Sequence, residues 1–258
     1  MKKIWIGTSW KMTKDKRAAQ AWASAVTPAL IESEDTIQAF VIPPFPYISQ
    51  VAESFSNLPI LIGAQNMGWQ DQGAFTGEVS PLMVKECGAS VVEIGHSERR
   101  AMFGETDETV NLKVRAALKH GLTPLVCVGD TAQEKKWGVS IESVVRQVKI
   151  ALFGVESHQL AQVIIAYEPV WAIGEQGTPA TNEEAEWVHL AIRQALQQQY
   201  GQACANDMTL VCGGSVNLDN AEGLLAQPNI DGVFVGRSAW QAEGYAELLS
   251  IALRQRSK

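Results

Sequence analysis

The sequence predicts an α/β protein whose fold is a closed (β/α)8 barrel, in a single domain that spans residues 1–258. Short apolar runs alternate with longer amphipathic segments from one end of the chain to the other, which favours strands alternating with helices. Eight such units in 258 residues are typical of a closed barrel. A doubly wound open sheet is the rival fold, but it usually has fewer strands for this length. Its Gly-rich dinucleotide fingerprint is also missing after the first strand.

The eight predicted strands are short and apolar, as expected for strands that are buried on both faces of a parallel sheet. No linker, low-complexity stretch or strong internal repeat separates them, so we expect one domain. The predicted strands are Ile4–Gly7, Gln38–Ile42, Ile60–Ala64, Val91–Ile94, Thr123–Val128, Val163–Tyr167, Thr209–Cys212 and Gly232–Val235.

Amphipathic periodicity predicts the helices between these strands. In three segments, apolar residues recur on one helical face: Ala18, Trp22, Ala25 and Ala29; Val110, Val114, Ala117 and Leu118; and Ala185, Val188, Ile192 and Ala195. Helix ends carry their own signals. These are an N-cap with a first-turn proline at Ser80-Pro81, capping boxes at Thr131–Glu134 and Thr181–Glu184, and a helix stop at Gly121.

The amino-acid composition excludes a few classes of function but does not identify one. The net charge of −7 argues against a nucleic-acid surface, and 46% hydrophobic with 19% charged residues is typical of a soluble globular protein. The four cysteines show neither metal-ligand spacing nor a disulfide framework, so we expect a reducing cytoplasm. The N-terminal apolar run is too short for a signal peptide, and no segment approaches the roughly 20 apolar residues of a membrane span. We expect no metal, nucleotide or flavin cofactor.

The most informative stretch is VIIAYEPVWAIG, from Val163 to Gly174. Its apolar run ends in one carboxylate, Glu168, and Pro169 then prevents further ladder hydrogen bonding. In a parallel barrel the active site is built from the loops that follow the strands. Glu168 is therefore either a general base under a closing loop or a strand-end residue that merely meets solvent.

Polar residues also follow the first and fourth strands. Ser9 and Lys11 are two apart, so both are expected to point into the barrel mouth. If Ser97 opens a short helix, its amides point at His96 and disfavour the protonated ring, so that a neutral imidazole donates to a carbonyl. Glu98 is expected to pair with Lys11 or with an arginine. The alternatives are a solvated lysine and a charged helix start with ordinary ion pairs.

Glycine turns follow the last two strands. Gly213-Gly214-Ser215 and Gly236-Arg237 each expose backbone N–H groups before a helical segment, which suits a phosphate group. Each turn alone is also compatible with a plain connection. Together with the earlier residues they predict proton abstraction beside a carbonyl: Glu168 removes the proton, His96 polarises the oxygen and Lys11 offsets the developing charge.

These residues resemble the triosephosphate isomerase family, the established example of a Glu base beside a neutral His. The resemblance covers roughly residues 5–240. Its motifs are Ser9-Trp10-Lys11-Met12, Ala64-Gln65-Asn66, Gly73–Glu78, Gly95–Arg100, Phe103-Gly104-Glu105, Ala166–Gly174 and Gly213–Val216. The resemblance implies a TIM barrel without a cofactor, which acts on a small phosphorylated sugar.

The resemblance also assigns site residues. The implied catalytic residues are Lys11, His96 and Glu168, with Ser9 and Glu98 in support. The implied phosphate and substrate contacts are Gly174, Gly214, Ser215, Gly236 and Arg237. The segment around Thr76 matches the loop that family members insert into a partner subunit, so we expect a homodimer without a nucleic-acid or membrane partner.

The departures from the family pattern are concentrated around the substrate. The usual pattern has Asn at Ser9, Tyr at Cys212 and Gly at Arg237, and its loop is one residue shorter over Glu175–Thr181. Replacing Asn by Ser leaves room for an extra hydroxymethyl group at the reacting carbon, and Arg237 is expected to add a bidentate phosphate contact. The longer loop, facing Cys212 in place of the Tyr hydroxyl, is expected to close through different hydrogen bonds.

With these departures the chain resembles the subgroup that isomerises erythrulose phosphates. We therefore expect conversion of L-erythrulose 1-phosphate to D-erythrulose 4-phosphate through an enediol. The alternative is an ordinary triosephosphate isomerase that interconverts glyceraldehyde 3-phosphate and dihydroxyacetone phosphate. A more distant alternative is a non-catalytic protein that binds phosphosugars.

Overall fold

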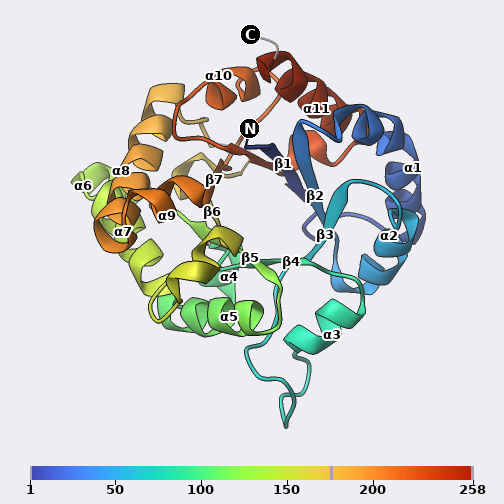
Figure 1. The fold of residues 1–258 in the computed structure, drawn as a ribbon, viewed down its shortest axis with the longest axis horizontal. Coiled ribbons are helices and arrows are strands. Elements are labelled where there is room, and N and C mark those ends of the chain that lie inside the picture. Colours follow the sequence, from blue (N-terminus) through green and yellow to red (C-terminus); the bar gives the residue numbers. More distant parts are fainter. Residues whose placement is uncertain (1, 175–176, 257–258) are drawn as a thin grey trace.

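The structure, a computed structural model, describes residues 2–174 and 177–256, in which eight parallel strands close into a barrel (Figure 1). Each strand pairs with its neighbours in chain order, and β1 pairs with β8 to close the ring. The predicted closed (β/α)8 barrel is confirmed. The strands are β1 (Ile4–Ser9), β2 (Ile37–Ile42), β3 (Ile60–Ala64), β4 (Val91–Ile94), β5 (Thr123–Val128), β6 (Ile164–Tyr167), β7 (Thr209–Cys212) and β8 (Gly232–Val235).

Three strand ends differ from the prediction. β2 begins one residue earlier, at Ile37, and β6 one residue later, at Ile164. β1 runs to Ser9, in register with Ile42 of β2, rather than ending at Gly7. Ser9 is therefore held by the sheet and not by a loop.

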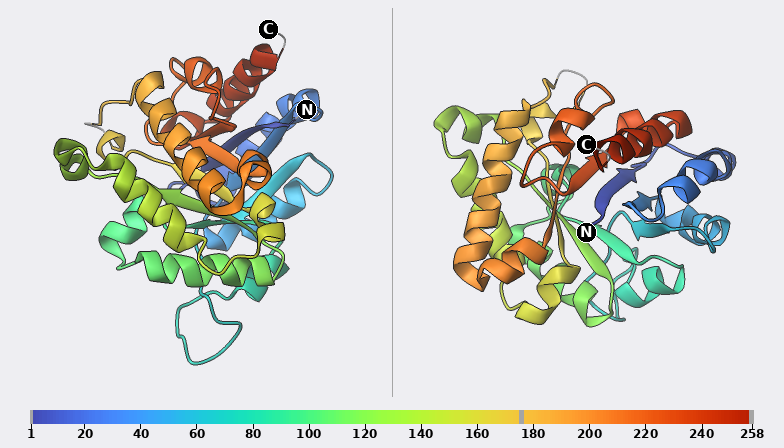
Figure 2. Two further views of the ribbon diagram at one scale, coloured as in Figure 1. Left: turned by 60° about the vertical axis from the view of Figure 1, so that its left-hand side comes forward. Right: turned by 45° about the horizontal axis from the view of Figure 1, so that its top comes forward.

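Helices surround the barrel and cover its outer face (Figures 1 and 2). The α-helices are α1 (Lys16–Ser33), α2 (Ile48–Ser54), α3 (Pro81–Glu86), α4 (Ser97–Met102), α5 (Asp107–Lys119), α6 (Ala132–Trp137), α7 (Ser140–Ala151), α8 (Asn182–Tyr200), α9 (Gln202–Asp207), α10 (Ala221–Leu225) and α11 (Ala242–Arg256). Four short 3₁₀ turns are η1 (Phe45–Tyr47), η2 (Ser157–Gln162), η3 (Val170–Ala172) and η4 (Arg237–Ala239) among the described residues.

The predicted helix signals are largely confirmed. Ser80 caps α3, and the capping boxes at Thr131 and Thr181 open α6 and α8. The predicted apolar faces of α5 and α8 are buried. The predicted face of α1 is wrong, because the buried residues are Ala19, Trp22, Ala23, Val26, Leu30 and Ser33, whereas Ala25 is exposed. Alanine is small enough to lie on either face, so the larger Trp22, Val26 and Leu30 decide the orientation.

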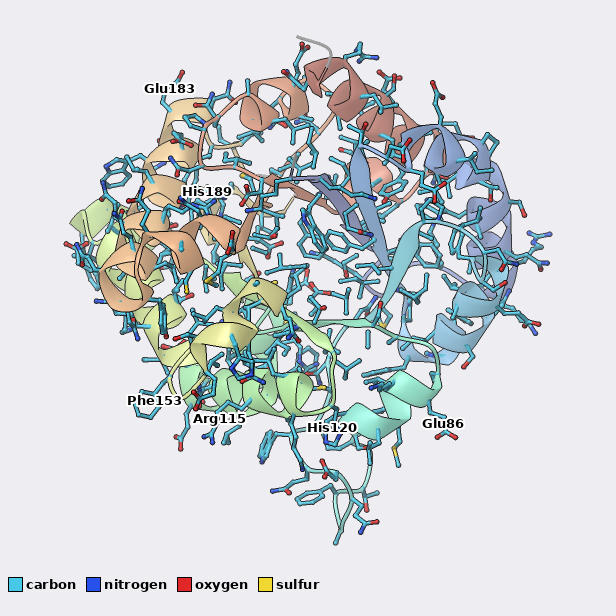
Figure 3. All side chains as sticks on the ribbon, in the orientation of Figure 1. Glu86, Arg115, His120, Phe153, Glu183 and His189 are labelled. Atoms are coloured by element: carbon cyan, nitrogen blue, oxygen red, sulfur yellow. The ribbon has the colours of Figure 1, made fainter. Side chains whose placement is uncertain are left out.

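Side chains fill the space inside the strands, as Figure 3 shows. Successive residues of a strand point alternately into the barrel and out toward the helices. The inner apolar cluster contains Phe40, Ile42, Val91, Leu125, Cys127, Ile164, Ala166, Val211 and Phe234. This packed interior leaves the residues at the carboxyl ends of the strands as the floor of a site.

The loop between β3 and α3 projects away from the barrel in Figure 1 and in the left view of Figure 2. It carries Thr76, which is exposed, next to Phe75, whose side chain is 48% exposed. Exposed aromatic side chains on a protruding loop are typical of protein contacts. Among the described helices, none has an apolar stretch long enough to cross a bilayer.

Candidate active site at the carboxyl ends of the strands

The ten pocket residues predicted from the sequence line a single cavity of about 440 Å³. They come from the ends of β1, β4, β6, β7 and β8, which lie far apart in the chain. These residues are Ser9, Lys11, His96, Glu98, Glu168, Gly174, Gly214, Ser215, Gly236 and Arg237. Thr76 is not part of this cavity and lies on the projecting loop.

Glu168 enters the cavity directly after β6. Its backbone N–H donates to the Val128 carbonyl at 2.8 Å, which continues the ladder for one residue before Pro169. The side chain is buried, and its Oε2 has no hydrogen-bond partner among the described residues. A Cβ at Gly213 would lie 2.8 Å from Glu168 Cγ and Oε1, so glycine is required there. The carboxylate is thus held in place with one oxygen free to accept a proton.

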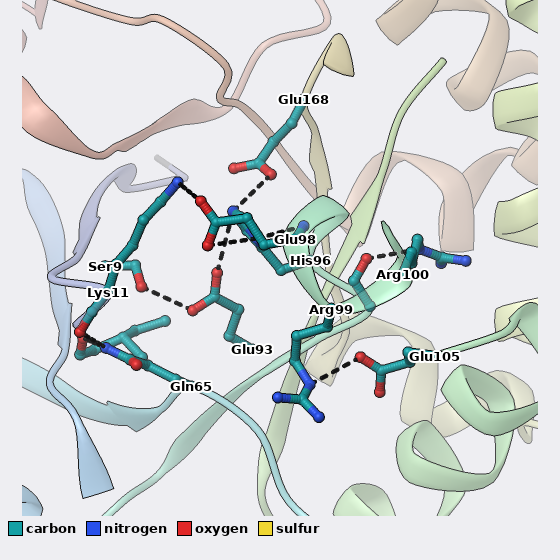
Figure 4. A network of polar contacts seen from close by, with 12 residues as sticks. Ser9, Lys11, Gln65, Glu93, His96, Glu98, Arg99, Arg100, Glu105 and Glu168 are labelled. Atoms are coloured by element: carbon teal, nitrogen blue, oxygen red, sulfur yellow. Dashed lines mark hydrogen bonds and ion pairs between the residues drawn. The ribbon is translucent and has the colours of Figure 1, made fainter. Parts of the chain in front are cut away.

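His96 is the N-cap of α4, which begins at Ser97 as predicted. Its Nδ1 accepts a hydrogen bond from the Glu98 backbone N–H at 3.1 Å. An accepting Nδ1 carries no proton, so the neutral ring has its proton on Nε2. Nε2 lies 3.5 Å from Glu168 Oε2 (Figure 4). The ring therefore presents an N–H donor beside the free carboxylate oxygen.

Lys11 lies in a strained backbone conformation, with φ of 51°. Positive φ is uncommon for residues other than glycine and clusters at functional sites. The Gln65 amide supports it, because Nε2 donates to the carbonyls of Lys11 at 2.8 Å and Ile42 at 3.2 Å. Lys11 Nζ pairs with Glu98 Oε1 at 2.5 Å. Of the two partners expected for Glu98, Lys11 or an arginine, the structure therefore shows Lys11. The ammonium group is thereby held over the cavity.

Glu93 is a functional candidate that sequence reasoning missed. It lies on β4, is fully buried, and its Oε2 accepts a hydrogen bond from the Ser9 hydroxyl at 2.9 Å. Burial, reinforced by the charge of Glu168 and opposed by His96, raises the pKa of Glu93 from its ordinary 4.5 to about 7. The available signal was a single Glu interrupting the apolar run Val91–Ile94.

Asp130, after β5, is a second missed residue. Its carboxylate accepts hydrogen bonds from the Tyr167 hydroxyl at 2.9 Å, Trp171 Nε1 at 3.1 Å and the Ser140 hydroxyl at 2.7 Å. Trp171 belongs to η3, which follows Glu168. Asp130 therefore anchors the first turn of the loop that follows Glu168.

The turns after β7 and β8 form the other end of the cavity. Gly214 and Ser215 both have positive φ, 70° and 59°, and the Ser215 hydroxyl donates to the Ala172 carbonyl of η3. Arg237 is exposed and forms no ion pair with any residue that the structure describes. Cys212 is buried, and burial raises the pKa of its thiol to about 12. The predicted longer loop includes residues 175 and 176, which lie outside the described residues.

Within the described ranges, no group of three or more His, Cys, Asp or Glu side chains is arranged to hold a metal ion. The chemistry that this site can perform follows from its own groups. A free carboxylate oxygen, a neutral N–H donor and an ammonium group surround one space, which is the arrangement required to move a proton next to a carbonyl.

Known proteins match this chain over nearly its whole length. A family model described as triosephosphate isomerase matches residues 4–252. A Rhizobium etli protein named L-erythrulose-1-phosphate isomerase is 47% identical over 248 residues, which cover 96% of this chain and 91% of the relative. Proteins of the same name from Brucella abortus and Mesorhizobium japonicum are each 47% identical, over 97% and 96% of this chain and 96% of each relative.

Proposed function

The chain belongs to the triosephosphate isomerase family and is an isomerase of a phosphosugar, and we propose that it converts L-erythrulose 1-phosphate to D-erythrulose 4-phosphate. The observation that carries the reaction type is the free Oε2 of Glu168, which lies 3.5 Å from Nε2 of the neutral His96. The names of the relatives and the serine at position 9 support the four-carbon substrate.

The proposed reaction moves the carbonyl from carbon 2 to carbon 3 by two proton transfers, one between the carbons and one between their oxygens. Glu168 removes the proton from carbon 3, and the C–H electron pair forms a double bond to carbon 2. The carbonyl oxygen on carbon 2 gains negative charge, which the His96 N–H and the Lys11 ammonium stabilise. The proton of the carbon 3 hydroxyl then passes to the oxygen on carbon 2, which becomes a hydroxyl. The oxygen on carbon 3 becomes the new carbonyl oxygen, and Glu168 returns its proton to carbon 2. Atoms and electrons balance without a cofactor.

The phosphate group is proposed to bind at the opposite end of the cavity. Gly174, Gly214, Ser215 and Gly236 line that end, where backbone N–H groups suit an anion. Arg237 supports this proposal, because the residue lines the cavity and its guanidinium has no carboxylate partner among the described residues. A guanidinium that faces a phosphate forms charge-assisted, bidentate hydrogen bonds.

Steady-state kinetics with two substrates test this function. We expect kcat/KM for L-erythrulose 1-phosphate to exceed the value for glyceraldehyde 3-phosphate. A value for glyceraldehyde 3-phosphate near the diffusional ceiling of about 10⁸–10⁹ M⁻¹s⁻¹ would instead establish an ordinary triosephosphate isomerase. Binding of phosphoglycolate, an enediolate mimic, without turnover of either sugar phosphate would establish a non-catalytic binding protein.

We also propose a homodimer located in the cytoplasm. The projecting loop that carries Thr76 supports the dimer, since Phe75 and Trp69 on this loop expose apolar surface, 48% and 39% of each residue. Sedimentation equilibrium of the purified protein tests the dimer, and a monomeric mass at micromolar concentration would overturn it.

A further inference from the structure

Glu93 is a buried carboxylate in the barrel interior, next to the inner apolar cluster. It lies on β4 two residues after Val91, so both side chains point inward, and Val91 belongs to the inner apolar cluster. Placing a carboxylate there is costly unless hydrogen bonds compensate, and an aliphatic side chain would pack at this position without that cost. The carboxylate therefore calls for a role that an aliphatic residue would not fill.

The contacts of Glu93 point to the reacting end of the cavity. Its Oε2 accepts from the Ser9 hydroxyl at 2.9 Å, and its Oε1 lies 3.9 Å from His96 Nε2. Figure 4 shows Glu93 between these two side chains, with Glu168 on the other side of the imidazole. Ser9 lines the cavity, whereas Glu93 lies behind it and does not. Glu93 therefore acts on whatever occupies the cavity through its neighbours.

The hydrogen bond to Glu93 determines what Ser9 offers to a ligand. Because the Ser9 hydroxyl donates its proton to the Glu93 carboxylate, Ser9 Oγ can act only as a hydrogen-bond acceptor toward a ligand in the cavity. L-Erythrulose 1-phosphate differs from dihydroxyacetone phosphate by one hydroxymethyl group on the reacting carbon. A site built to pair with a hydroxyl discriminates against the analogue that lacks it, because its buried polar group is then left unpaired.

We propose that Glu93 is a positioning residue that holds the Ser9 hydroxyl so that Ser9 Oγ accepts a hydrogen bond from the hydroxymethyl group of a four-carbon ketose phosphate. The Glu93–Ser9 pair is thus the specificity subsite of the pocket. This inference rests on the proposed function, since it concerns the choice between four-carbon and three-carbon substrates and not the proton transfer itself.

The test is the ratio of kcat/KM for L-erythrulose 1-phosphate to kcat/KM for glyceraldehyde 3-phosphate. Ser9→Ala removes the acceptor and is expected to lower this ratio about tenfold, the effect of one hydrogen bond. Glu93→Leu is expected to lower the ratio similarly. Glu93→Gln keeps an acceptor oxygen of the same reach, so it should retain most of the wild-type ratio. A general loss of structure would lower both activities together and leave the ratio unchanged.

Two further variants sharpen the test. Thr8→Val is the matched control, because Thr8 is the buried neighbour of Ser9 on β1 and points toward the helices; its ratio should equal that of the wild type. In the double variant Ser9→Ala with Glu93→Leu, the ratio should fall no further than in Ser9→Ala alone, because Glu93 acts through Ser9.

The outcomes separate the two proposals. If the wild type turns over glyceraldehyde 3-phosphate but not L-erythrulose 1-phosphate, both the proposed function and the subsite are overturned. If the wild type is active on the four-carbon substrate but Ser9→Ala leaves the ratio unchanged, only the subsite is overturned. If Glu93→Leu does not fold, Ser9→Ala and Glu93→Gln still decide the matter.

Discussion

The burial of Glu93 predicts that this residue makes the protein less stable as the pH rises. The pKa of its carboxyl is raised from 4.5 to about 7, chiefly by desolvation. Between these two pH values the folded protein keeps the proton, while the unfolded chain has lost it. The folded state therefore binds more protons, and the free energy of unfolding falls as the pH rises through this window. At about 1.4 kcal/mol per pKa unit, the loss is about 3 kcal/mol.

The substitution Glu93→Gln removes this titration with little change in volume. Relative to the wild type, the variant should gain about 3 kcal/mol of unfolding free energy between pH 4.5 and pH 8. Urea unfolding at both pH values, at one fixed protein concentration, measures this difference, and comparing the two proteins cancels the titration of distant groups. His96, Glu168 and Lys11 also act on this carboxyl, so the titration belongs to the cluster.

Ser9→Ala is the control with the opposite sign. The Ser9 hydroxyl lowers the pKa of Glu93, so its removal should extend the loss of unfolding free energy to higher pH and make the total loss larger than in the wild type. If the wild type and Glu93→Gln differ by the same free energy at pH 4.5 and pH 8, the argument from burial is refuted.

Three other substitutions test separate parts of the structure. Glu168→Gln should lower kcat by about 10²–10⁴-fold with little change in KM in steady-state assays, and retained turnover would contradict its role as the base. Arg237→Gly should raise KM about tenfold with a smaller effect on kcat, and an unchanged KM would rule out a phosphate contact. Tyr245→Phe removes a buried hydroxyl that donates to the Ile6 carbonyl at 2.9 Å. It should lower the free energy of unfolding by about 1 kcal/mol in urea titrations, and a wild-type midpoint would contradict this.

The fold was predictable because its signals are local. Strands that are apolar on both faces and helices with capping boxes, such as those at Thr131 and Thr181, depend on nearest neighbours in the chain. The position of Glu168 was predictable for the same reason, since Pro169 ends the strand directly after it. The closed order of the strands then brings all the strand ends to one face.

The remaining features depend on contacts between distant segments. The direction of the Glu93 side chain is one example. Its neighbours Val92 and Ile94 are apolar, and so is Val91, so the alternation of polar and apolar residues does not tell the inner face of β4 from the outer face. Ser9 lies inside β1 because β2 extends to Ile42 and pairs with it, which a reading of β1 alone does not reveal. The support of Lys11 by Gln65 likewise joins residues that are 54 positions apart.

Glu98 positions two of the proposed catalytic residues, Lys11 through its side chain and His96 through its backbone. Its side chain pairs with Lys11, while its backbone N–H binds His96 Nδ1. Side-chain substitutions at position 98 can release the lysine, but they leave the amide hydrogen in place, and only proline removes it. The position of the Lys11 ammonium group is therefore sensitive to most substitutions of Glu98. The tautomer of His96 is insensitive to nearly all of them, because the backbone N–H that fixes it remains. In this pocket the proton donor is therefore more resistant to mutation than the position of the ammonium group.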